Sequence, residues 1–355
     1  MKPAADTIRF ATTEDNVRLA WSVSGQGLPL VKAANWLTHL EYDRKSVVWG
    51  HWQKFLEQHF NYYRYDERAI DMSQQQVEDL SPAQWAPDLE CVINAAKPEK
   101  PFVLMGISQG CGAALTYAAK YPDNVSKLII YGGYLQGWAL RNPEEARRRE
   151  AVRELVELGW GTPNPVFRRL YTSMFMPEGT EQQLAWFDEM CAKSTTPELA
   201  ARLMGEQGYA DFSTLPEQVE VPTLVMHCRD DSVVPYSQGV EIASRIRDAE
   251  FVELDSRNHI LLDNDPAWES FGRLILEFTG QSSAAEDALF ASLSDRERGV
   301  LGQITAGHSN IEISNRLFIS EKTVKNHITN IFEKLGVSNR SQAIVKARDG
   351  GFTHD

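Results

Sequence analysis

Three residues that lie far apart in the sequence could together perform acyl transfer: a serine, an aspartate and a histidine. Ser108 lies in Gly106-Ile107-Ser108-Gln109-Gly110, the G-x-S-x-G pattern of a serine on a tight turn. Glycines two residues to either side suit such a strained turn because they carry no side chain. A serine nucleophile needs a base, and the base needs an acid that orients it. Asp230-Asp231 and then His259 supply these residue types downstream, in the order Ser, Asp, His.

The elements around these residues must bring them together. The apolar run at residues 102–105 is typical of a buried parallel strand, and residues 109–121 have the composition of a helix that ends before Pro122. Asp231 and His259 each follow a further predicted strand, at residues 222–228 and 250–254. All three residues therefore fall beyond the carboxyl ends of strands, where loops of an α/β sheet meet.

The rest of the first 279 residues alternates between strand and helix patterns, which indicates a mostly parallel sheet covered on both faces. Residues 136–215 interrupt this alternation with several helical patterns, and we expect them to form an inserted helical cap. The run from Arg147 to Arg149 lies beside three glutamates, which favours a solvent-exposed helix face over an anion site. Five aromatic residues either line an apolar pocket or pack the cap itself: Trp138, Trp160, Phe175, Trp186 and Phe187.

With these motifs in place, residues 1–279 resemble an α/β-hydrolase domain with a helical cap. The family's G-x-x-D-x-x-V-P motif falls on residues 228–235 and selects Asp231 rather than Asp230 as the acid, with His259 as the base. The family's loop after an early strand falls on residues 34–36. The resemblance therefore implies that the backbone N–H groups of Trp36 and Gln109 form an oxyanion hole.

The sequence departs from the family pattern at several loop positions. Ala34-Asn35 stands where the family has His-Gly, and Cys228 replaces a glycine. The family's D-x-R-G-x-G-x-S motif falls on residues 66–73, where Ala69 and Asp71 replace both glycines. The predicted triad is chemically complete, but the supporting loops differ from those of a typical catalyst, so the sequence leaves turnover open.

The carboxyl-terminal part of the sequence has a different charge. Residues 293–348 contain nine Lys and Arg against five Asp and Glu, although the whole chain has a net charge of −13. Four short helices with tight turns are expected here, the first opened by Ser294 with Glu297 completing a capping box. This pattern predicts an all-α helix-turn-helix unit.

The same segment resembles the LuxR/GerE-type DNA-binding domain. The matching motifs are L-S-x-R-E at residues 293–297, G-x-S-N-x-E-I-[SA] at 307–314, I-S-x-K-T-V-K-x-H at 319–327 and K-L-G-V-x-N-R at 334–340. The resemblance implies that the helix of residues 321–335 enters the major groove of double-stranded DNA, and that homodimers bind paired half-sites. It implies base contacts by Lys325, Asn326 and Thr329, and phosphate contacts by Lys322, Thr323, Asn310 and Arg316.

The sequence lacks the patterns that are typical of secreted, membrane-spanning and metal-binding proteins. The sequence has no run of 18 apolar residues and no apolar segment behind Met1, and its four cysteines form no C-x-x-C pair. Its histidines have no metal-ligand spacing. We therefore expect a cytoplasmic protein with no membrane span, no metal and no other cofactor.

Two domains are predicted: a ligand-binding α/β-hydrolase-like domain at residues 1–279 and the DNA-binding domain at residues 289–355, joined by a linker at residues 280–288. The combination favours a transcriptional regulator controlled by a small molecule, such as an ester or lactone. One alternative is an active serine hydrolase of esterase or lactonase type with a DNA-binding tail. The other is a constitutive DNA-binding protein whose hydrolase-like domain is a dimerisation scaffold.

Overall fold

The apolar runs of the hydrolase-like part pair into one sheet. The computed structural model describes residues 7–281, 290, 292–349 and 352. The strands within those ranges are β1 Arg9–Thr12, β2 Arg18–Ser24, β3 Pro29–Lys32, β4 Asn61–Tyr65, β5 Phe102–Ile107, β6 Val125–Tyr131, β7 Thr223–Cys228 and β8 Glu250–Leu254. They lie side by side in the order β1-β2-β4-β3-β5-β6-β7-β8.

The sheet is mostly parallel, which confirms the predicted fold class. The strands β1 and β2 form an antiparallel hairpin, and β2 also pairs antiparallel with β4. All other pairs are parallel. The strand β5, which leads into Ser108, lies between β3 and β6 and is buried along its whole length. The carboxyl ends of β3, β5, β6, β7 and β8 therefore meet at one edge of the sheet, where a site can be assembled.

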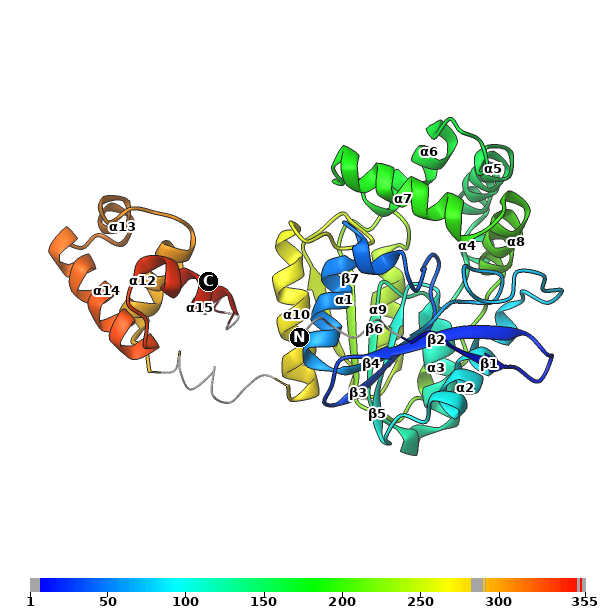
Figure 1. Cartoon of the computed structure of the whole chain (residues 1–355), viewed down its shortest axis with the longest axis horizontal. Coiled ribbons are helices and arrows are strands. Elements are labelled where there is room, and N and C mark those ends of the chain that lie inside the picture. The colour runs from blue at the N-terminus through cyan, green and yellow to red at the C-terminus, as the bar shows by residue number, and fades with distance from the viewer. Residues whose placement is uncertain (1–6, 282–289, 291, 350–351, 353–355) are drawn as a thin grey trace. The chain divides into compact units, whose positions relative to one another are not determined.

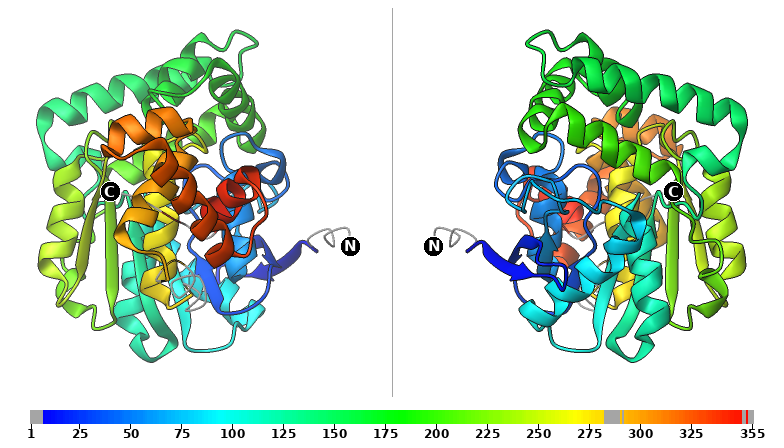
Figure 2. Two further views of the ribbon diagram at one scale, coloured as in Figure 1. Left: turned by 90° about the vertical axis from the view of Figure 1, so that its left-hand side faces the viewer. Right: turned by 90° about the vertical axis from the view of Figure 1, so that its right-hand side faces the viewer.

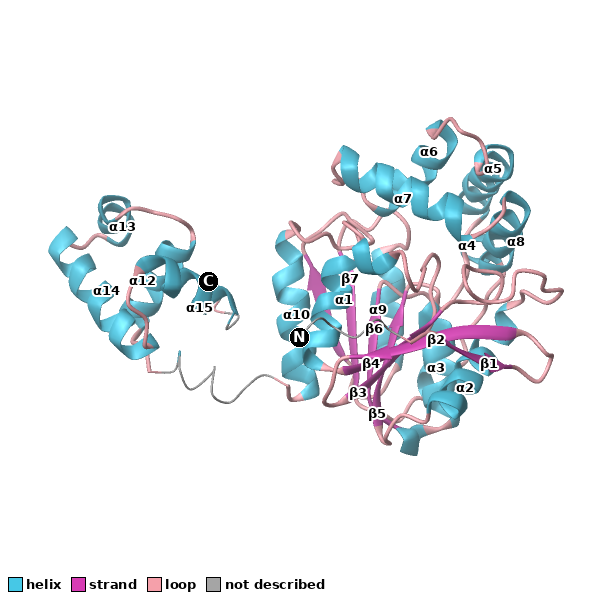
Figure 3. Ribbon diagram, in the orientation of Figure 1, coloured by secondary structure: helices cyan, strands magenta, loops and turns pink. Residues whose placement is uncertain are grey.

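Helices cover both faces of this sheet (Figure 3). One face carries α1 (Gly50–His59) and α10 (Pro266–Thr279), and the other carries α2 (Trp85–Ala96), α3 (Gly110–Lys120) and α9 (Tyr236–Arg245). Trp52 of α1 is 1% exposed and packs on Phe271 of α10 with ring centroids 4.6 Å apart. Burial of such large aromatic side chains contributes much of the apolar core on that face.

The predicted cap consists of α4 (Trp138–Arg141), α5 (Pro143–Gly159), α6 (Val166–Phe175), α7 (Glu181–Ser194) and α8 (Pro197–Gly208). These helices lie above the carboxyl ends of the strands, as Figures 1 and 2 show from three sides. An isolated β-bridge between Gln136 and Asp211 joins the two ends of the cap at its base. The cap is therefore an insertion between β6 and β7 that covers the edge where the site residues meet.

The carboxyl-terminal part forms the predicted helical unit, with α12 (Asp295–Thr305), α13 (Asn310–Leu317), α14 (Glu321–Leu335) and α15 (Arg340–Asp349). The predicted capping box of Ser294 and Glu297 is present, and Ser309 with Glu312 forms a second one. The core consists of apolar residues from all four helices together with Phe290 and Leu293, among them Val300, Leu301, Ile304, Ile313, Val324, Ile331, Leu335 and Ala347. The 3.6-residue period of α14 thus turns its apolar stripe inward.

Two compact units make up the chain, residues 1–272 and 273–355. The predicted linker lies almost entirely outside the described residues, and its bounds stay a prediction. Within the described ranges, each helix is too short or too polar to cross a lipid bilayer.

A buried carboxylate links the first and third helices of the helical unit and makes its stability depend on pH. Lys334 Nζ donates to Glu297 Oε2 at 2.7 Å, and the backbone N–H of Ser294 donates to the same oxygen at 2.8 Å. Burial alone would raise the pKa of Glu297, but these hydrogen bonds lower it to about 2. A carboxyl whose pKa is lowered in the folded state stabilises that state above its usual pKa of 4.5 and loses the effect as the pH falls towards 2.

We therefore predict that Glu297→Gln speeds amide hydrogen exchange in α12 and α14 of the full-length chain by about fivefold or more at pH 7. The difference from wild type should shrink between pH 4.5 and pH 2. Mass spectrometry of peptic fragments measures both. Glu333→Gln, at an exposed position of α14, is the matched control and should leave exchange unchanged. Equal protection of wild type and Glu297→Gln at pH 7 would contradict the prediction.

Candidate functional site

Ser108 lies on a left-handed turn between β5 and α3. Its φ is +51°, a conformation that is strained for a residue with a side chain. The flanking glycines are required by close packing. A Cβ on Gly106 would lie 2.7 Å from the Cα of Cys111, and one on Gly110 would lie 2.6 Å from the carbonyl oxygen of Ala34. The G-x-S-x-G pattern is thus explained by the lack of space for a side chain at either glycine.

Asp231 and His259, which the sequence separates by 28 positions, are hydrogen-bonded to each other. His259 Nδ1 lies 2.6 Å from Asp231 Oδ2, and the other carboxylate oxygen accepts from the backbone N–H groups of Val233 and Val234. Burial alone would raise the pKa of Asp231, but the charge and hydrogen bond of His259 lower it. The neighbouring Asp230 is exposed. The carboxylate chosen by the family motif is therefore the one that contacts the histidine.

His259 has one ring nitrogen available for a reacting group. Its side chain is 2% exposed, and Nε2 has no hydrogen-bond partner in the part of the chain that the structure describes. The backbone N–H groups of His259 and Ile260 both donate to the carbonyl of Phe175, at the end of the cap helix α6. With Nδ1 donating to Asp231, Nε2 carries the lone pair and is the atom that could accept a proton.

Ser108 and His259 meet at the end of β6. The backbone N–H of Ser108 donates to the carbonyl of Tyr131 at 2.8 Å. A Cβ on the next residue, Gly132, would lie 3.0 Å from His259 Cε1 and 3.8 Å from Asp231 Oδ2. Among the described residues, however, no hydrogen bond joins the Ser108 side chain to His259 Nε2. The fold thus brings the three predicted residues to one place without forming the serine–histidine bond, and their catalytic roles stay predictions.

The two residues predicted to form the oxyanion hole lie in the same cavity as Ser108. Within the described residues, neither the backbone N–H of Trp36 nor that of Gln109 donates a hydrogen bond. The side chain of Gln109 is held on both sides: its Nε2 donates to Glu67 at 2.6 Å, and its Oε1 accepts from Gln207 of the cap at 2.9 Å. Burial raises the pKa of Glu67 to about 8. The loop geometry therefore leaves both predicted N–H donors available.

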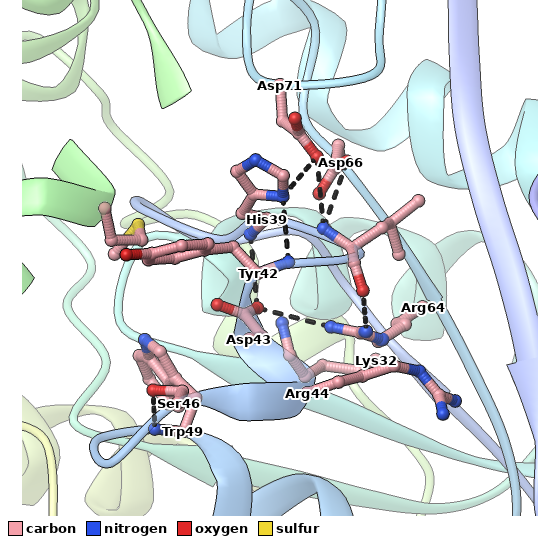
Figure 4. A network of polar contacts seen from close by, with 12 residues as sticks. Lys32, His39, Tyr42, Asp43, Arg44, Ser46, Trp49, Arg64, Asp66 and Asp71 are labelled. Atoms are coloured by element: carbon pink, nitrogen blue, oxygen red, sulfur yellow. Dashed lines mark hydrogen bonds and ion pairs between the residues drawn. The ribbon is translucent and has the colours of Figure 1, made fainter. Parts of the chain in front are cut away.

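A buried polar network holds the loop that follows β3 (Figure 4). Lys32 donates to Asn35, directly before Trp36, and burial lowers the pKa of Lys32 to about 8. Arg64 pairs with Asp43 at 3.2 Å and also donates to the carbonyl of Leu40. The backbone N–H of Leu40 in turn donates to the carboxylates of Asp66 and Asp71. Burial, followed by the charge of Asp71, raises the pKa of Asp66 well above its usual range.

This network includes the two positions where the sequence lacks the family's glycines. Ala69 has a φ of +65° and Asp71 a φ of +44°, so the left-handed backbone remains although the glycines do not. The backbone N–H of Asp71 donates to Ser194 at the end of α7, and Thr195 Oγ1 donates to the carbonyl of Ala69 at 3.0 Å. The segment therefore binds the cap to the sheet.

Ser108 opens into a narrow cavity under the cap, which we call the Ser108 cavity. Its free volume is about 50 Å³. Of the five aromatic residues that the sequence left undecided, Trp138 and Phe175 line it, Trp160 and Phe187 are buried elsewhere, and Trp186 stacks on Tyr42. The full lining is Trp36, Ser108, Gln109, Tyr134, Trp138, Arg141, Arg149, Tyr171, Phe175, Met204, Gln207, Val233 and Val234.

One lining residue, Arg149, contradicts the expectation for the arginine run. Arg147 and Arg148 are exposed, as predicted, but Arg149 is turned inward and lines the Ser108 cavity with Arg141. Consecutive residues on a helix point about 100° apart, so three adjacent arginines cannot all face solvent when one side of the helix is buried.

As for metals, the described residues contain no group of three or more His, Cys, Asp or Glu side chains that could hold an ion.

The second candidate site is the outer face of α14. Four of the predicted DNA contacts, Lys322, Lys325, Asn326 and Thr329, are exposed on this helix. Thr323 is half-buried and its hydroxyl contacts Ser320, the residue that caps the helix. On α13, Arg316 is exposed, whereas Asn310 is half-buried and accepts a hydrogen bond from Arg340 at 3.3 Å. The polar face is thus open to a partner, and its contacts with DNA stay predictions.

The chain matches two family models along separate segments. One, described as serine aminopeptidase, S33, covers residues 51–267, and the other, described as bacterial regulatory proteins, luxR family, covers residues 291–347. Pyrrolizixenacetamide deacetylase of Xenorhabdus hominickii is 24% identical over 253 residues, which cover 70% of this chain and 91% of that protein. The DNA-binding transcriptional activator DevR/DosR of Mycobacterium tuberculosis is 32% identical over 117 residues, 33% of this chain and 48% of that protein. The chain therefore spans about half the length of that regulator.

Solved structures agree on the fold of the first unit. A bromoperoxidase from Bacillus anthracis has a TM-score of 0.63 at 19% identity, covering 77% of this chain and all of that one. Fold and comparisons thus define an α/β-hydrolase joined to a helix-turn-helix domain. More particularly, the chain belongs to the serine aminopeptidase S33 family and carries a luxR-family DNA-binding domain at residues 291–347.

The lack of space for a side chain at Gly110 can be tested by measuring the free energy of unfolding of the first unit. We predict that Gly110→Ala destabilises this unit by about 1–3 kcal/mol, because the new methyl group has to displace the loop at Ala34. All nine tryptophans lie between residues 21 and 268, so urea unfolding followed by tryptophan fluorescence reports on this unit.

The matched control is Gly205→Ala in α8, where a Cβ would meet only a side-chain atom at 3.8 Å. This variant should be neutral or more stable by up to about 1 kcal/mol, since alanine favours helix over glycine. Equal stability of Gly110→Ala and wild type would show that the turn has more room than the structure indicates.

Proposed function

We propose that this protein is a cytoplasmic DNA-binding transcriptional regulator whose affinity for its operator depends on a small molecule bound in the Ser108 cavity. The observation that carries the proposal is the presence, in one chain, of a luxR-family DNA-binding domain and a cavity under the cap at a strained serine. The polar outer face of α14 supports DNA as the partner. A four-helix module of this size contacts few base pairs, so the proposal includes a homodimer on paired half-sites.

The size of the cavity supports control by a ligand. A cavity of about 50 Å³ has room for only a few water molecules, since one water needs on the order of 10–15 Å³ of such free volume. A ligand with more than a few atoms therefore has to move side chains of the cap, so the occupied and empty states differ in structure. Such a difference is required for regulation, because a ligand shifts an equilibrium only by its unequal affinity for the two states.

A second candidate function is serine hydrolysis of an ester or lactone. The observation that favours it is the Asp231–His259 pair, whose Nε2 has no partner within the described residues. In this mechanism His259 takes the proton of Ser108 as the hydroxyl attacks the carbonyl, and the N–H groups of Trp36 and Gln109 stabilise the oxyanion. Slow hydrolysis would also remove the ligand and reset a sensor, so the two functions are compatible.

The DNA-binding face gives the first test. We predict that Lys325→Ala weakens binding to a duplex selected from a random pool by the full-length chain, by about 1–3 kcal/mol if Lys325 contacts a base. The exposed pair of Lys325 with Glu321, at 2.9 Å, contributes little to folding, so the variant should remain folded. Fluorescence anisotropy measures the affinity. The control Lys346→Ala, on α15, removes the same charge away from this face; equal losses in both variants would contradict the assignment.

Blocking the cavity gives the second test. We expect a fluorophosphonate to add one phosphonyl group to Ser108 with loss of fluoride, and to leave Ser108→Ala unmodified, as intact-mass spectrometry can show. Filling the cavity in this way should change the affinity for the selected duplex by about fivefold or more. Ser108→Ala treated with the same fluorophosphonate is the control for effects of the reagent that do not depend on modification of Ser108.

The outcomes separate the alternatives. Modification of Ser108 without any change in DNA affinity would refute control through this cavity. Steady turnover of 4-nitrophenyl acetate that is lost in Ser108→Ala would then favour the hydrolase. DNA binding that neither phosphonylation nor any tested small molecule changes, with no turnover, would favour a constitutive DNA-binding protein.

A further inference from the structure

Two arginines in the wall of the Ser108 cavity lie beside one buried glutamate. Arg141 ends α4, while Glu145 and Arg149 are one turn apart on α5. The side chains of Arg141, Glu145 and Arg149 are 9%, 8% and 13% exposed, so all three are largely removed from water. Charged groups in such a place are stabilised by partners, and the pairing among them is therefore informative.

Arg141 binds both carboxylate oxygens of Glu145. Arg141 Nε donates to one carboxylate oxygen of Glu145 at 2.9 Å, and Arg141 Nη2 donates to the other. The remaining guanidinium nitrogen, Nη1, donates to the carbonyl of Gln136 at 3.1 Å. This two-point pairing is the favoured geometry of arginine with a carboxylate. Arg141 and Glu145 thus neutralise each other.

Arg149 has no such partner. Within the described residues its one hydrogen bond runs from Nη2 to the carbonyl of Val233, and its Nε lies 4.0 Å from the carboxylate that Arg141 occupies. Asp231 attracts Arg149 electrostatically but is hydrogen-bonded to His259 and to two backbone N–H groups. Burial, and then the charge of Arg141, lowers the pKa of Arg149. Two guanidinium groups therefore share one carboxylate. Arg149 has only the longer, 4.0 Å ion pair with it, so most of its N–H donors have no acceptor among the described residues.

The rest of the wall is mainly aromatic. Trp36, Trp138, Tyr171 and Phe175 line the cavity with Ser108 and Arg149. The hydroxyl of Tyr171 accepts a hydrogen bond from the indole N–H of Trp36, which leaves the rings as the available surface. A ligand that fits these groups has an apolar body and one acidic group. A planar guanidinium with free N–H donors matches a carboxylate, which accepts two of them at once.

We propose that Arg149 binds the carboxylate of the small molecule that occupies the Ser108 cavity, and that this ligand is a small apolar or aromatic carboxylic acid. The proposal rests on the proposed function, since it specifies the ligand of that same cavity. Where the ligand also contains an ester, lactone or amide, its carbonyl lies at Ser108 while the acid lies at Arg149. Arg149 is thereby assigned to selecting the ligand, and no covalent step depends on it.

The test compares acids with their amides, which have nearly the same shape and no charge. Isothermal titration calorimetry on the full-length chain measures the affinity for 3-phenylpropanoate and 3-phenylpropanamide, and for the straight-chain acids and amides from propanoate to octanoate. In wild type we expect at least one acid to bind about tenfold or more tightly than its amide, as for a hydrogen bond to a charged group. In Arg149→Met this preference should fall below about twofold.

Arg148→Gln is the matched control, because it removes an exposed arginine from the neighbouring position of the same helix. It should keep the wild-type preference. If Arg149→Met does not fold, as judged by tryptophan fluorescence, Arg149→Lys replaces it; loss of at least half of the preference supports the proposal and an unchanged preference overturns it. The proposal is also overturned if no acid binds wild type more tightly than its amide, or if Arg149→Met keeps the preference.

Failure of this proposal and failure of the proposed function give different results. Acid binding that depends on Arg149, with no effect of any bound acid on DNA affinity, supports the carboxylate site and contradicts regulation through the cavity. A change in DNA affinity on phosphonylation of Ser108, without any preference for acids, supports regulation and overturns the carboxylate site.

Discussion

The left-handed turn at Ser108 is the constraint on which the rest of the site depends. Its backbone N–H is bound to the end of β6, Gly106 allows α3 to approach, and Gly110 allows the loop after β3 to approach. The end of β6, the helix α3 and the loop after β3 are thus fixed around the Ser108 side chain. At the two glycines there is no room for a further atom. A strained conformation of this kind persists only when the surrounding structure determines it. The serine hydroxyl, the histidine and the two free N–H groups converge for this reason.

The loop at residues 66–73 has left-handed backbone at the two positions where the family motif has glycines. Ala69 and Asp71 take up the left-handed backbone that glycine would adopt without strain, at a cost on the order of 1–3 kcal/mol each. Compensation comes from the contacts of this segment with the cap, and from Asp66 and Asp71, which both accept from Leu40. The carboxylate of Asp71, which a glycine could not provide, therefore joins this segment to the loop after β3. The bonds to the cap are made by the backbone of Ala69 and Asp71, which a glycine would also have.

The sequence predicts the features that depend on residues close together in the chain. It does not predict which face of a helix other segments bury. The strand-turn-helix at Ser108 and the capping box of Ser294 follow from residue types at short spacing, and both are present. Arg149 was assigned to solvent because its neighbours are charged. A signal was available, since Glu145, Arg149, Val152 and Val156 share one helical face, and Val156 is buried. That Arg149, near the head of this stripe, lines a cavity depends on the packing of α5 against other segments, which spacing alone does not supply.

The distribution of charge limits how the two parts of the chain can cooperate. The DNA-binding segment has an excess of basic residues, so the net charge of −13 belongs to the remaining residues. An acidic domain is repelled by the phosphate backbone and contributes no affinity for DNA of its own. A ligand in the Ser108 cavity therefore has no electrostatic route to the duplex through the surface of its own domain. In the proposed function, the ligand acts through the conformations in which a homodimer presents its two helix-turn-helix modules. The coupling then equals the difference in ligand affinity between those conformations, and we expect it to arise from movement of the cap around the Ser108 cavity.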